Sequence, residues 1–384
     1  MPLYPPRAWQ IEAMSRWIAA GHRGIISVVT GGGKTIFALS CIAQLRPDTT
    51  LIVVPTAALL EQWWEESAFY FSISLEEVHI VRRAGRLKTG SINLAVINTA
   101  SELPSTGNWG NLLLIVDECH KAASETFRKV LEIRAKASLG LSATPERPYD
   151  DGLAEVLIPA LGPVIFTYDY AAALAEGVIV PFTLNNVVFD LEQDRQVEYD
   201  KLSKAIARLM KQEGPESPRT IALMLKRARV LNLSLNRVKI ALKLVAMNRS
   251  KRTLIFHEDI QACEIIAAVL EKSGVPSGIY HSKMRIKARA EALKSYRSGR
   301  YEVLVTCRAL DEGFNVPETQ LGIIAASTAT RRQRIQRLGR IVRPAPDKRT
   351  ANIYTLVATR PEIERLKEEE GLLEGVASIH WSKA

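Results

Sequence analysis

Short apolar runs rich in β-branched residues recur along this chain, and stretches with helical periodicity separate them. In the N-terminal part the runs are 25–29, 51–54, 94–97, 112–116 and 137–141. In the C-terminal part they are 253–256, 277–280, 303–306, 322–325 and 352–356. Apolar runs of this length that alternate with helices are typical of strands buried on both faces of a parallel sheet. The sequence therefore predicts an α/β fold with two doubly wound parallel sheets.

A long stretch between the two sets of strands has helical periodicity instead. It extends from Glu192 to about Met247, and the Gly-Pro-Glu-Ser-Pro segment at 214–218 interrupts it. Glycine and proline in a short polar segment end one helix and start another. We expect a helical hairpin here, with strand-like runs at 164–168 and 182–189 near its boundary with the first sheet.

A glycine-rich turn follows the first apolar run. It consists of Gly31, Gly32 and Gly33 and leads through Lys34 into a helix predicted from Thr35 to Leu45. Glycines allow backbone N–H groups to converge on a phosphate at a helix N-terminus, a lysine can reach the β- and γ-phosphates, and the Thr35 hydroxyl can bind Mg²⁺. The strict phosphate-loop pattern has a further glycine where this chain has Val28. The alternative interpretation is a structural turn.

Two acidic residues follow the fourth apolar run. Asp117 and Glu118 come directly after it, at the end of a strand where α/β sheets present ligand-binding groups. We expect Asp117 to hold Mg²⁺ and Glu118 to orient and deprotonate an attacking water. A solvated strand end is the alternative, but the phosphate loop upstream favours a hydrolytic site.

Composition and charge indicate a globular protein with a basic C-terminal half. The 384 residues are 47% hydrophobic and include no stretch of about 20 apolar residues, so we expect a cytoplasmic protein without a membrane span. Residues 1–184 contain 15 basic and 18 acidic side chains, whereas residues 185–384 contain 36 and 23. Ten lysines and arginines and no acids lie between Pro218 and Arg252. We expect three of them, Lys226, Arg227 and Arg229, to contact a nucleic-acid backbone, with a solvated helix face as the alternative.

Several short motifs follow one another along the chain: Arg7-Ala8-Trp9-Gln10, the phosphate loop, Val54-Pro55-Thr56 with Gln62-Trp63, Asp117-Glu118-Cys119-His120, residues 139–147, residues 310–317 and residues 336–344. In this order they resemble the motifs of superfamily 2 helicases, especially the short archaeal and bacterial XPB (xeroderma pigmentosum group B) type. The resemblance covers nearly the whole chain. It implies two RecA-like domains with a helical thumb-like insert, and these would span 1–184 and 251–366, with the insert at 185–250 and a C-terminal tail at 367–384.

The resemblance also implies a role for each matching residue. Arg7 and Gln10 would recognise adenine. The nucleic-acid backbone would be contacted by Pro55, Thr56 and Thr99. The nucleotide site would be coupled to strand binding by His120, Ser142 and Thr144. In the second domain His257 would lie in the segment that grips the strand, while Asp311 and Gly313 would sense ATP and strand. Gln336, Arg340 and Arg343 would face the γ-phosphate, the two arginines as arginine fingers.

The implied activity is ATP- and Mg²⁺-dependent 3′–5′ movement along DNA, or its unwinding, in repair or genome maintenance. The family's Arg-Glu-Asp tripeptide has no match here, which leaves strand separation open. We expect a monomer whose partners are DNA and a nuclease or repair protein, and no membrane. The alternatives are the motor subunit of a restriction or phage-defence system, an RNA-directed helicase, and a nucleotide-dependent clamp that does not turn over ATP.

Overall fold

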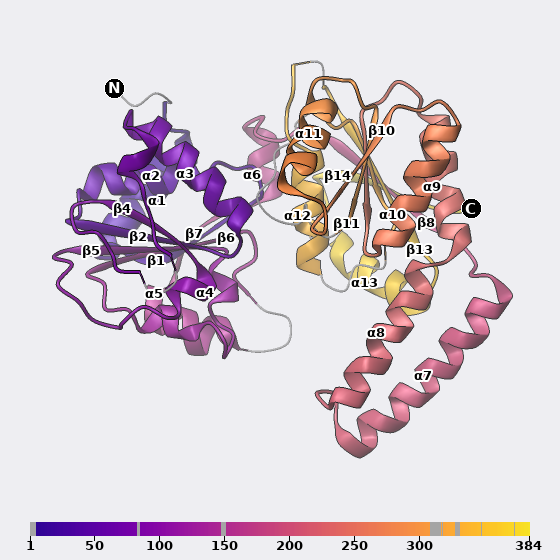
Figure 1. Ribbon diagram of the computed structural model, residues 1–384, viewed down its shortest axis with the longest axis horizontal. Helices are drawn as coiled ribbons and strands as arrows, with labels where there is room; N and C mark the ends of the chain where they lie inside the picture. Colours follow the sequence, from indigo (N-terminus) through magenta and orange to yellow (C-terminus); the bar gives the residue numbers. More distant parts are fainter. Residues whose placement is uncertain are drawn as a thin grey trace. The chain divides into compact units, whose positions relative to one another are not determined.

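The computed structural model describes residues 5–82, 85–146, 151–307, 316, 318–326, 331–346, 348–371 and 373–384. The described chain forms two compact units that divide between Glu176 and Gly177 (Figure 1). Each unit contains one seven-stranded sheet in which all neighbouring strands are parallel, with helices packed on it. The predicted α/β class with two parallel sheets is confirmed.

The first sheet has the strand order β3-β4-β2-β5-β6-β1-β7. Its strands are β1 (Arg23–Val28), β2 (Thr49–Val54), β3 (His79–Ile80), β4 (Ile92–Val96), β5 (Leu112–Asp117), β6 (Ala137–Ser142) and β7 (Val164–Tyr168). Its α-helices are α1 (Ala8–Ala19), α2 (Lys34–Leu45), α3 (Ala57–Phe71), α4 (Ile97–Ala100), α5 (Ile158–Leu161) and α6 (Tyr170–Ala175). Short 3₁₀ or π turns span Leu75–Glu77, Cys119–Lys121, Arg128–Glu132 and Leu153–Leu157. The central strands β2, β5 and β6 are buried along their whole length, which explains their continuous apolar sequence.

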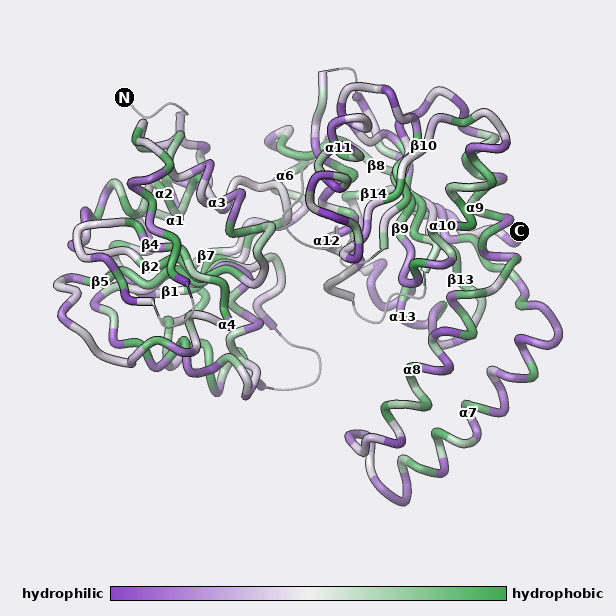
Figure 2. The backbone as a smooth tube through the Cα atoms, viewed as in Figure 1, coloured by the Kyte–Doolittle hydropathy of each residue, from purple (hydrophilic) through white to green (hydrophobic). Residues whose placement is uncertain are grey.

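The second sheet has the order β10-β11-β9-β12-β13-β8-β14. Its strands are β8 (Phe182–Val188), β9 (Thr253–His257), β10 (Ser277–His281), β11 (Val303–Cys307), β12 (Leu321–Ile324), β13 (Ala351–Val357) and β14 (Ala377–Lys383). The helices of this unit outside the hairpin are α9 (Leu235–Met247), α10 (Ile260–Lys272), α11 (Ile286–Arg297), α12 (Arg331–Ile341) and α13 (Arg360–Glu370). The tube in Figure 2 is most apolar along the central strands of each sheet.

A helical hairpin extends from the second unit. It consists of α7 (Gln193–Glu213) and α8 (Pro218–Asn232), which lie side by side (Figure 1). The Ser217 side chain caps α8 by accepting a hydrogen bond from the Thr220 backbone, and Pro218 occupies the first turn. The hairpin predicted from the Gly-Pro-rich segment is confirmed.

The unit boundaries differ from those expected from the sequence. Strand β8 pairs with β13 and β14, so the second unit begins at Gly177 and not after residue 184. Helix α9 contributes Val238 and Leu244 to the second hydrophobic core, and Leu231 near the end of α8 joins them, so the insert consists of α7 and the earlier part of α8. Residues 367–384 are not a separate tail, because they form the end of α13 and the edge strand β14. In β14, half-buried and exposed residues alternate, so it lacks the apolar run that marks a buried strand.

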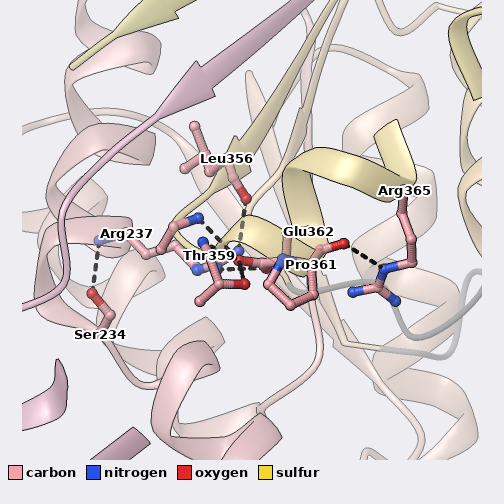
Figure 3. A network of polar contacts seen from close by, with 8 residues as sticks. Ser234, Arg237, Leu356, Thr359, Pro361, Glu362 and Arg365 are labelled. Atoms are coloured by element: carbon pink, nitrogen blue, oxygen red, sulfur yellow. Dashed lines mark hydrogen bonds and ion pairs between the residues drawn. The ribbon is translucent and has the colours of Figure 1, made fainter. Parts of the chain in front are cut away.

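A buried ion pair joins α9, the helix that follows the hairpin, to α13 (Figure 3). Arg237 of α9 is fully buried and donates hydrogen bonds to the Leu356 carbonyl at 2.9 Å and to Glu362 Oε1 at 3.1 Å. The other Glu362 oxygen accepts from the Thr359 backbone and hydroxyl, both at 3.0 Å. Arg237 is one of the ten basic residues between Pro218 and Arg252, but its buried contacts stabilise the fold and leave it unable to reach a phosphate.

Candidate functional site

Polar residues predicted to act together gather at one edge of the first sheet. In a parallel sheet the carboxyl ends of all strands meet at the same edge. The phosphate loop follows β1, Asp117 ends β5 and Ser142 ends β6, and β5, β6 and β1 are consecutive neighbours. Pro55 and Thr56 follow β2 at this edge, where the Thr56 hydroxyl accepts a hydrogen bond from Leu59 at 3.3 Å and caps α3. The next strand outward, β4, leads into the short helix that contains Thr99.

The turn after β1 has the backbone geometry of an anion-binding loop. Gly33 has φ +100°, a conformation that residues with a side chain rarely adopt. A Cβ at Gly32 would lie 2.5 Å from Val28 Cγ1, so only glycine fits without displacement. Lys34 and Thr35 then begin α2, whose first N–H groups have no partners within the helix and point toward the loop.

Side chains at the start of helix α1 hold this loop by donating hydrogen bonds to the backbone carbonyl groups of the loop. Trp9 Nε1 donates to Gly32 O at 3.2 Å, and Arg7 Nη1 donates to the same oxygen at 3.4 Å. The Gln10 amide donates to Gly33 O at 3.1 Å and accepts from the Arg7 backbone at 2.9 Å. In this conformation Arg7 and Gln10 therefore brace the loop, and their contact with adenine stays a prediction. Trp9 lies in the same motif, but the sequence analysis assigned no individual role to it.

Asp117 is buried beside a tryptophan that donates to it. Trp63 Nε1 of α3 lies 2.9 Å from Asp117 Oδ2, and the indole is completely buried. Burial raises the pKa of Asp117 to about 6; the Lys34 ammonium and the Trp63 hydrogen bond oppose that rise, whereas Glu118 adds to it. The sequence analysis named Trp63 only as part of a motif, so it missed this polar contact.

Glu118 stands at the centre of a chain of polar contacts. Lys34 Nζ donates to Glu118 Oε1 at 3.2 Å, and His120 Nδ1 lies 3.5 Å from Oε2. His120 Nδ1 also lies 3.0 Å from the Ser142 hydroxyl oxygen, which accepts from the Thr144 backbone at 3.1 Å. The structure thus links residues from the ends of three strands that are far apart in the sequence.

The electrostatics of the site keep Glu118 ionised. Burial acts to raise its pKa, but Lys34 and His120 together outweigh that effect and hold the pKa of this carboxyl below its usual value. Glu118 also has φ +48°, a strained backbone conformation for a residue with a side chain. A buried carboxylate fixed this way can accept a proton from a water placed next to it.

The residues at this edge fit a magnesium-bound nucleoside triphosphate. The Thr30 hydroxyl of the loop is buried, and its oxygen has no hydrogen-bond partner among the residues that the structure describes. Buried hydroxyls normally form a hydrogen bond, so a polar ligand in the loop would supply the partner of this one. Hard oxygen donors such as Asp117 and Thr35 are those that Mg²⁺ prefers.

Comparisons with known proteins show which proteins the chain resembles. Residues 3–147 match the model of the type III restriction enzyme res subunit, and residues 236–345 match the helicase conserved C-terminal domain. The chain is 29% identical to the DNA 3'-5' translocase XPB2 of Sulfurisphaera tokodaii over 88% of this chain and 78% of that protein. It is 26% identical to the DNA 3'-5' helicase XPB of Kineococcus radiotolerans over 92% of this chain and 59% of that protein. The chain is XPB-like: it carries two helicase-family domains of superfamily 2 and resembles XPB helicases over most of its length.

Solved structures agree on the fold of this helicase. The type ISP restriction-modification enzyme LlaBIII bound to DNA aligns with a TM-score of 0.69 at 14% identity, over 100% of this chain and 31% of that one. Dbp5 of S. cerevisiae bound to RNA and ADP BeF3 aligns with a TM-score of 0.66 at 13% identity, over 99% and 90%. Membership in the helicase family implies use of ATP. None of the described helices has the length and apolar character needed to span a membrane.

In the second unit of the helicase, one expected contact residue is buried. His257 ends β9, is fully buried, and accepts a hydrogen bond from the Asp259 backbone at 3.0 Å. Burial and the nearby Arg237 lower the pKa of His257 to about 3, so the ring is neutral. Direct contact of this side chain with a strand, as expected from the sequence, does not fit this position.

The arginines in helix α12 and just after it are buried or half-buried wherever the structure describes their side chains. Arg334 pairs with Glu369 at 2.6 Å and Arg337 pairs with Glu258, and both arginines are buried. Arg340 is buried as well, and Arg343 is half-buried after the helix end. The side chain of Gln336 and the whole of Asp311 and Gly313 lie outside the described residues.

Three basic residues of α8, which we call the hairpin cations, are exposed or half-exposed. Lys226 Nζ lies 4.0 Å from Glu198, and Arg229 Nε lies 3.7 Å from Asp259; the two basic side chains are 61% and 66% exposed. The Arg227 guanidinium lies 5.5 Å from the centre of the Tyr199 ring. Surface pairs of this kind are weak, so the hairpin cations can exchange these partners for phosphates.

Proposed function

We propose that this helicase is an ATP-driven 3′–5′ DNA translocase that hydrolyses ATP with the residues at the carboxyl edge of its first sheet. The observation that carries the proposal is the contact chain from Lys34 through Glu118 and His120 to Ser142. It connects a phosphate-binding lysine and a carboxylate base to the strand ends that lead toward a nucleic acid. The direction and the DNA substrate rest on the names of the relatives.

Each residue of the first unit has a role in this proposal. The loop N–H groups and Lys34 bind the β- and γ-phosphates, and Glu118 orients the attacking water and accepts its proton. Mg²⁺, when bound, neutralises phosphate charge, and Thr35 and Asp117 are the residues that would hold it. Arg7 and Gln10 monitor the occupant of the loop, because they already hydrogen-bond to its carbonyls.

His120, Ser142 and Thr144 would transmit the state of this site to the strand-binding residues. We assign Pro55, Thr56 and Thr99 to the backbone contacts, because they follow neighbouring strands of the same edge. We assign the hairpin cations to the same backbone. In the second unit Arg340 and Arg343, with Gln336, Asp311 and Gly313, would complete the hydrolytic site.

The experiment measures ATP turnover alone and with single-stranded DNA, duplex DNA, forked DNA and RNA. We expect DNA to stimulate turnover and Lys34→Ala to abolish it. The control variant Lys129→Ala removes an exposed lysine of the same unit and should behave as wild type. Displacement of a third strand from a DNA triplex then reports translocation, and opening of a forked duplex reports unwinding. ATP binding without turnover would mean a nucleotide-dependent clamp, and stimulation by RNA alone would mean an RNA-directed enzyme.

A second candidate is the motor subunit of a restriction or phage-defence system. The match of residues 3–147 to the res subunit model favours it. The two candidates share the motor chemistry and differ in the partner, a nuclease or a repair protein. Isolation of the protein from its own cells with a restriction nuclease subunit attached would favour the second candidate. For either one we propose a monomeric motor in the cytoplasm.

A further inference from the structure

A pocket of about 280 Å³ lies in the second unit, away from the carboxyl edge where the helicase motifs gather. Its lining residues belong to the amino ends of three parallel strands. Lys251 precedes β9, Gln320 precedes β12, and Thr350 and Asn352 flank the start of β13. In a parallel sheet the amino ends form the opposite edge. This pocket is therefore distinct from the proposed ATP and DNA contacts.

The backbone fixes the three walls of the pocket. Gln320 N donates to Arg252 O at 2.9 Å, and Asn352 N donates to Gln320 O at 3.0 Å. The register of the sheet places Leu321 opposite both Thr253 and Asn352. Because the walls are adjacent strands with paired backbones, the side chains that line the pocket are held at fixed spacing.

The lining is basic and rich in hydrogen-bond donors. Lys251 and Arg349 contribute two positive charges, Lys348 contributes a third when it is protonated, and no carboxylate stands among the described residues that line the pocket. Lys251 Nζ donates to Asn248 Oδ1 at 3.0 Å, which occupies one of its three donors. Gln320 Oε1 accepts from Arg252 N at 3.2 Å, so the amide nitrogen is the end of that side chain that can serve a ligand. The Glu318 carboxylate interacts electrostatically with Lys348. Its single negative charge leaves the net charge of the cluster positive.

Lys348 connects the pocket to helix α12. It is 6% exposed, and its ammonium donates to the carbonyl oxygens of Ile341 and, at 2.8 Å, of Arg343. These carbonyls stand at the end of the helix that carries Arg340. Burial lowers the pKa of Lys348 to about 7, and the Glu318 carboxylate opposes that effect. An anion next to Lys348 would favour its charged form and so strengthen its hold on the helix end.

We propose that this pocket binds a phosphate group. Lys251 and Arg349, the ammonium of Lys348 when it is protonated, two side-chain amides and a hydroxyl are the donor set that suits a tetrahedral anion. A pocket of about 280 Å³ has room for a diphosphate or for one phosphate of a nucleic-acid backbone. The site is independent of the proposed function, because binding at it requires no turnover of ATP.

The experiment titrates inorganic pyrophosphate by calorimetry into Lys34→Ala protein, which lacks the main phosphate ligand of the first unit. We expect this protein to bind pyrophosphate, and the further changes Lys251→Ala and Arg349→Ala to weaken binding at least tenfold. The matched control adds Lys272→Ala, which removes an exposed lysine of α10 outside the pocket. Equal binding by the Lys251/Arg349 variant and the control would overturn the proposal, as would no binding by the Lys34→Ala protein. A cooperative thermal transition at an unchanged temperature shows that each variant is folded.

A second arm identifies the source of the phosphate. Duplex DNA affinity is measured against salt concentration for wild-type protein, for Lys251→Ala/Arg349→Ala and for Lys272→Ala. A slope that falls by about one unit per lost phosphate contact only in the double variant assigns the pocket to a nucleic-acid backbone. An unchanged slope together with weakened pyrophosphate binding assigns it to a free phosphate compound.

Discussion

Replacement of Trp63 by phenylalanine tests whether Asp117 acts as a charged metal ligand. The indole donates one hydrogen bond, at 2.9 Å, to an Asp117 oxygen that is buried, and phenylalanine keeps an aromatic ring but has no donor. A hydrogen bond to a charged group contributes about 1.5–3 kcal/mol. Since about 1.4 kcal/mol corresponds to one pH unit, its loss should raise the pKa of Asp117 by about one to two.

The expected defect depends on pH. In wild-type protein the pKa of Asp117 is about 6, so its carboxylate is largely ionised at neutral pH. A carboxyl with a raised pKa loses its charge earlier as pH falls, and Mg²⁺ must then displace a proton. The half-saturating Mg²⁺ concentration for ATP hydrolysis should rise on the order of two- to tenfold at neutral pH, and the two proteins should converge about two pH units higher.

The assay is steady-state hydrolysis against Mg²⁺ concentration at several pH values. Trp64→Phe is the matched control, because the neighbouring indole donates to the Leu75 carbonyl at 2.7 Å and not to a carboxylate. The smaller ring also leaves a void that costs on the order of 1–3 kcal/mol of stability, so turnover is measured well below the unfolding temperature. An unchanged Mg²⁺ requirement at neutral pH, or a defect that does not vary with pH, would refute the assignment of Asp117.

Three further changes test the second unit. Arg343→Ala should leave ATP affinity near the wild-type value and lower DNA-stimulated turnover on the order of 10³-fold, and a turnover that stays near normal would exclude this arginine from the hydrolytic site. Arg237→Ala should lower the free energy of unfolding by about 3–5 kcal/mol in urea denaturation, because it leaves Glu362 buried without its cation, whereas the exposed Arg219→Ala should change it by less than about 1 kcal/mol. Reversal of the hairpin cations to glutamate should lower the slope of DNA affinity against salt by about one unit per lost phosphate contact with basal hydrolysis unchanged, and an equal slope would favour a solvated face.

The sequence by itself determined the central strands of the first unit and the position of its glycine-rich loop. Buried parallel strands need continuous apolar residues, so runs such as 112–116 could be recognised without neighbours. A phosphate loop needs glycine at positions that other residues cannot occupy, as Gly33 shows with its φ of +100°. Both signals are local, and local requirements leave a pattern in the sequence.

Tertiary structure alone decided which charged and polar side chains belong to the fold. Arg237 and the hairpin cations stand in the same basic stretch, yet Arg237 is buried against Glu362, a residue 125 positions away. Trp63 meets Asp117 across 54 positions, and β8 joins a sheet whose other strands begin 65 residues or more beyond its end. The energy of such contacts depends on which distant partner arrives and on the exclusion of water around the pair. A sequence pattern shows the type and spacing of residues, but which of them are buried and which distant residues pair is decided only by tertiary packing.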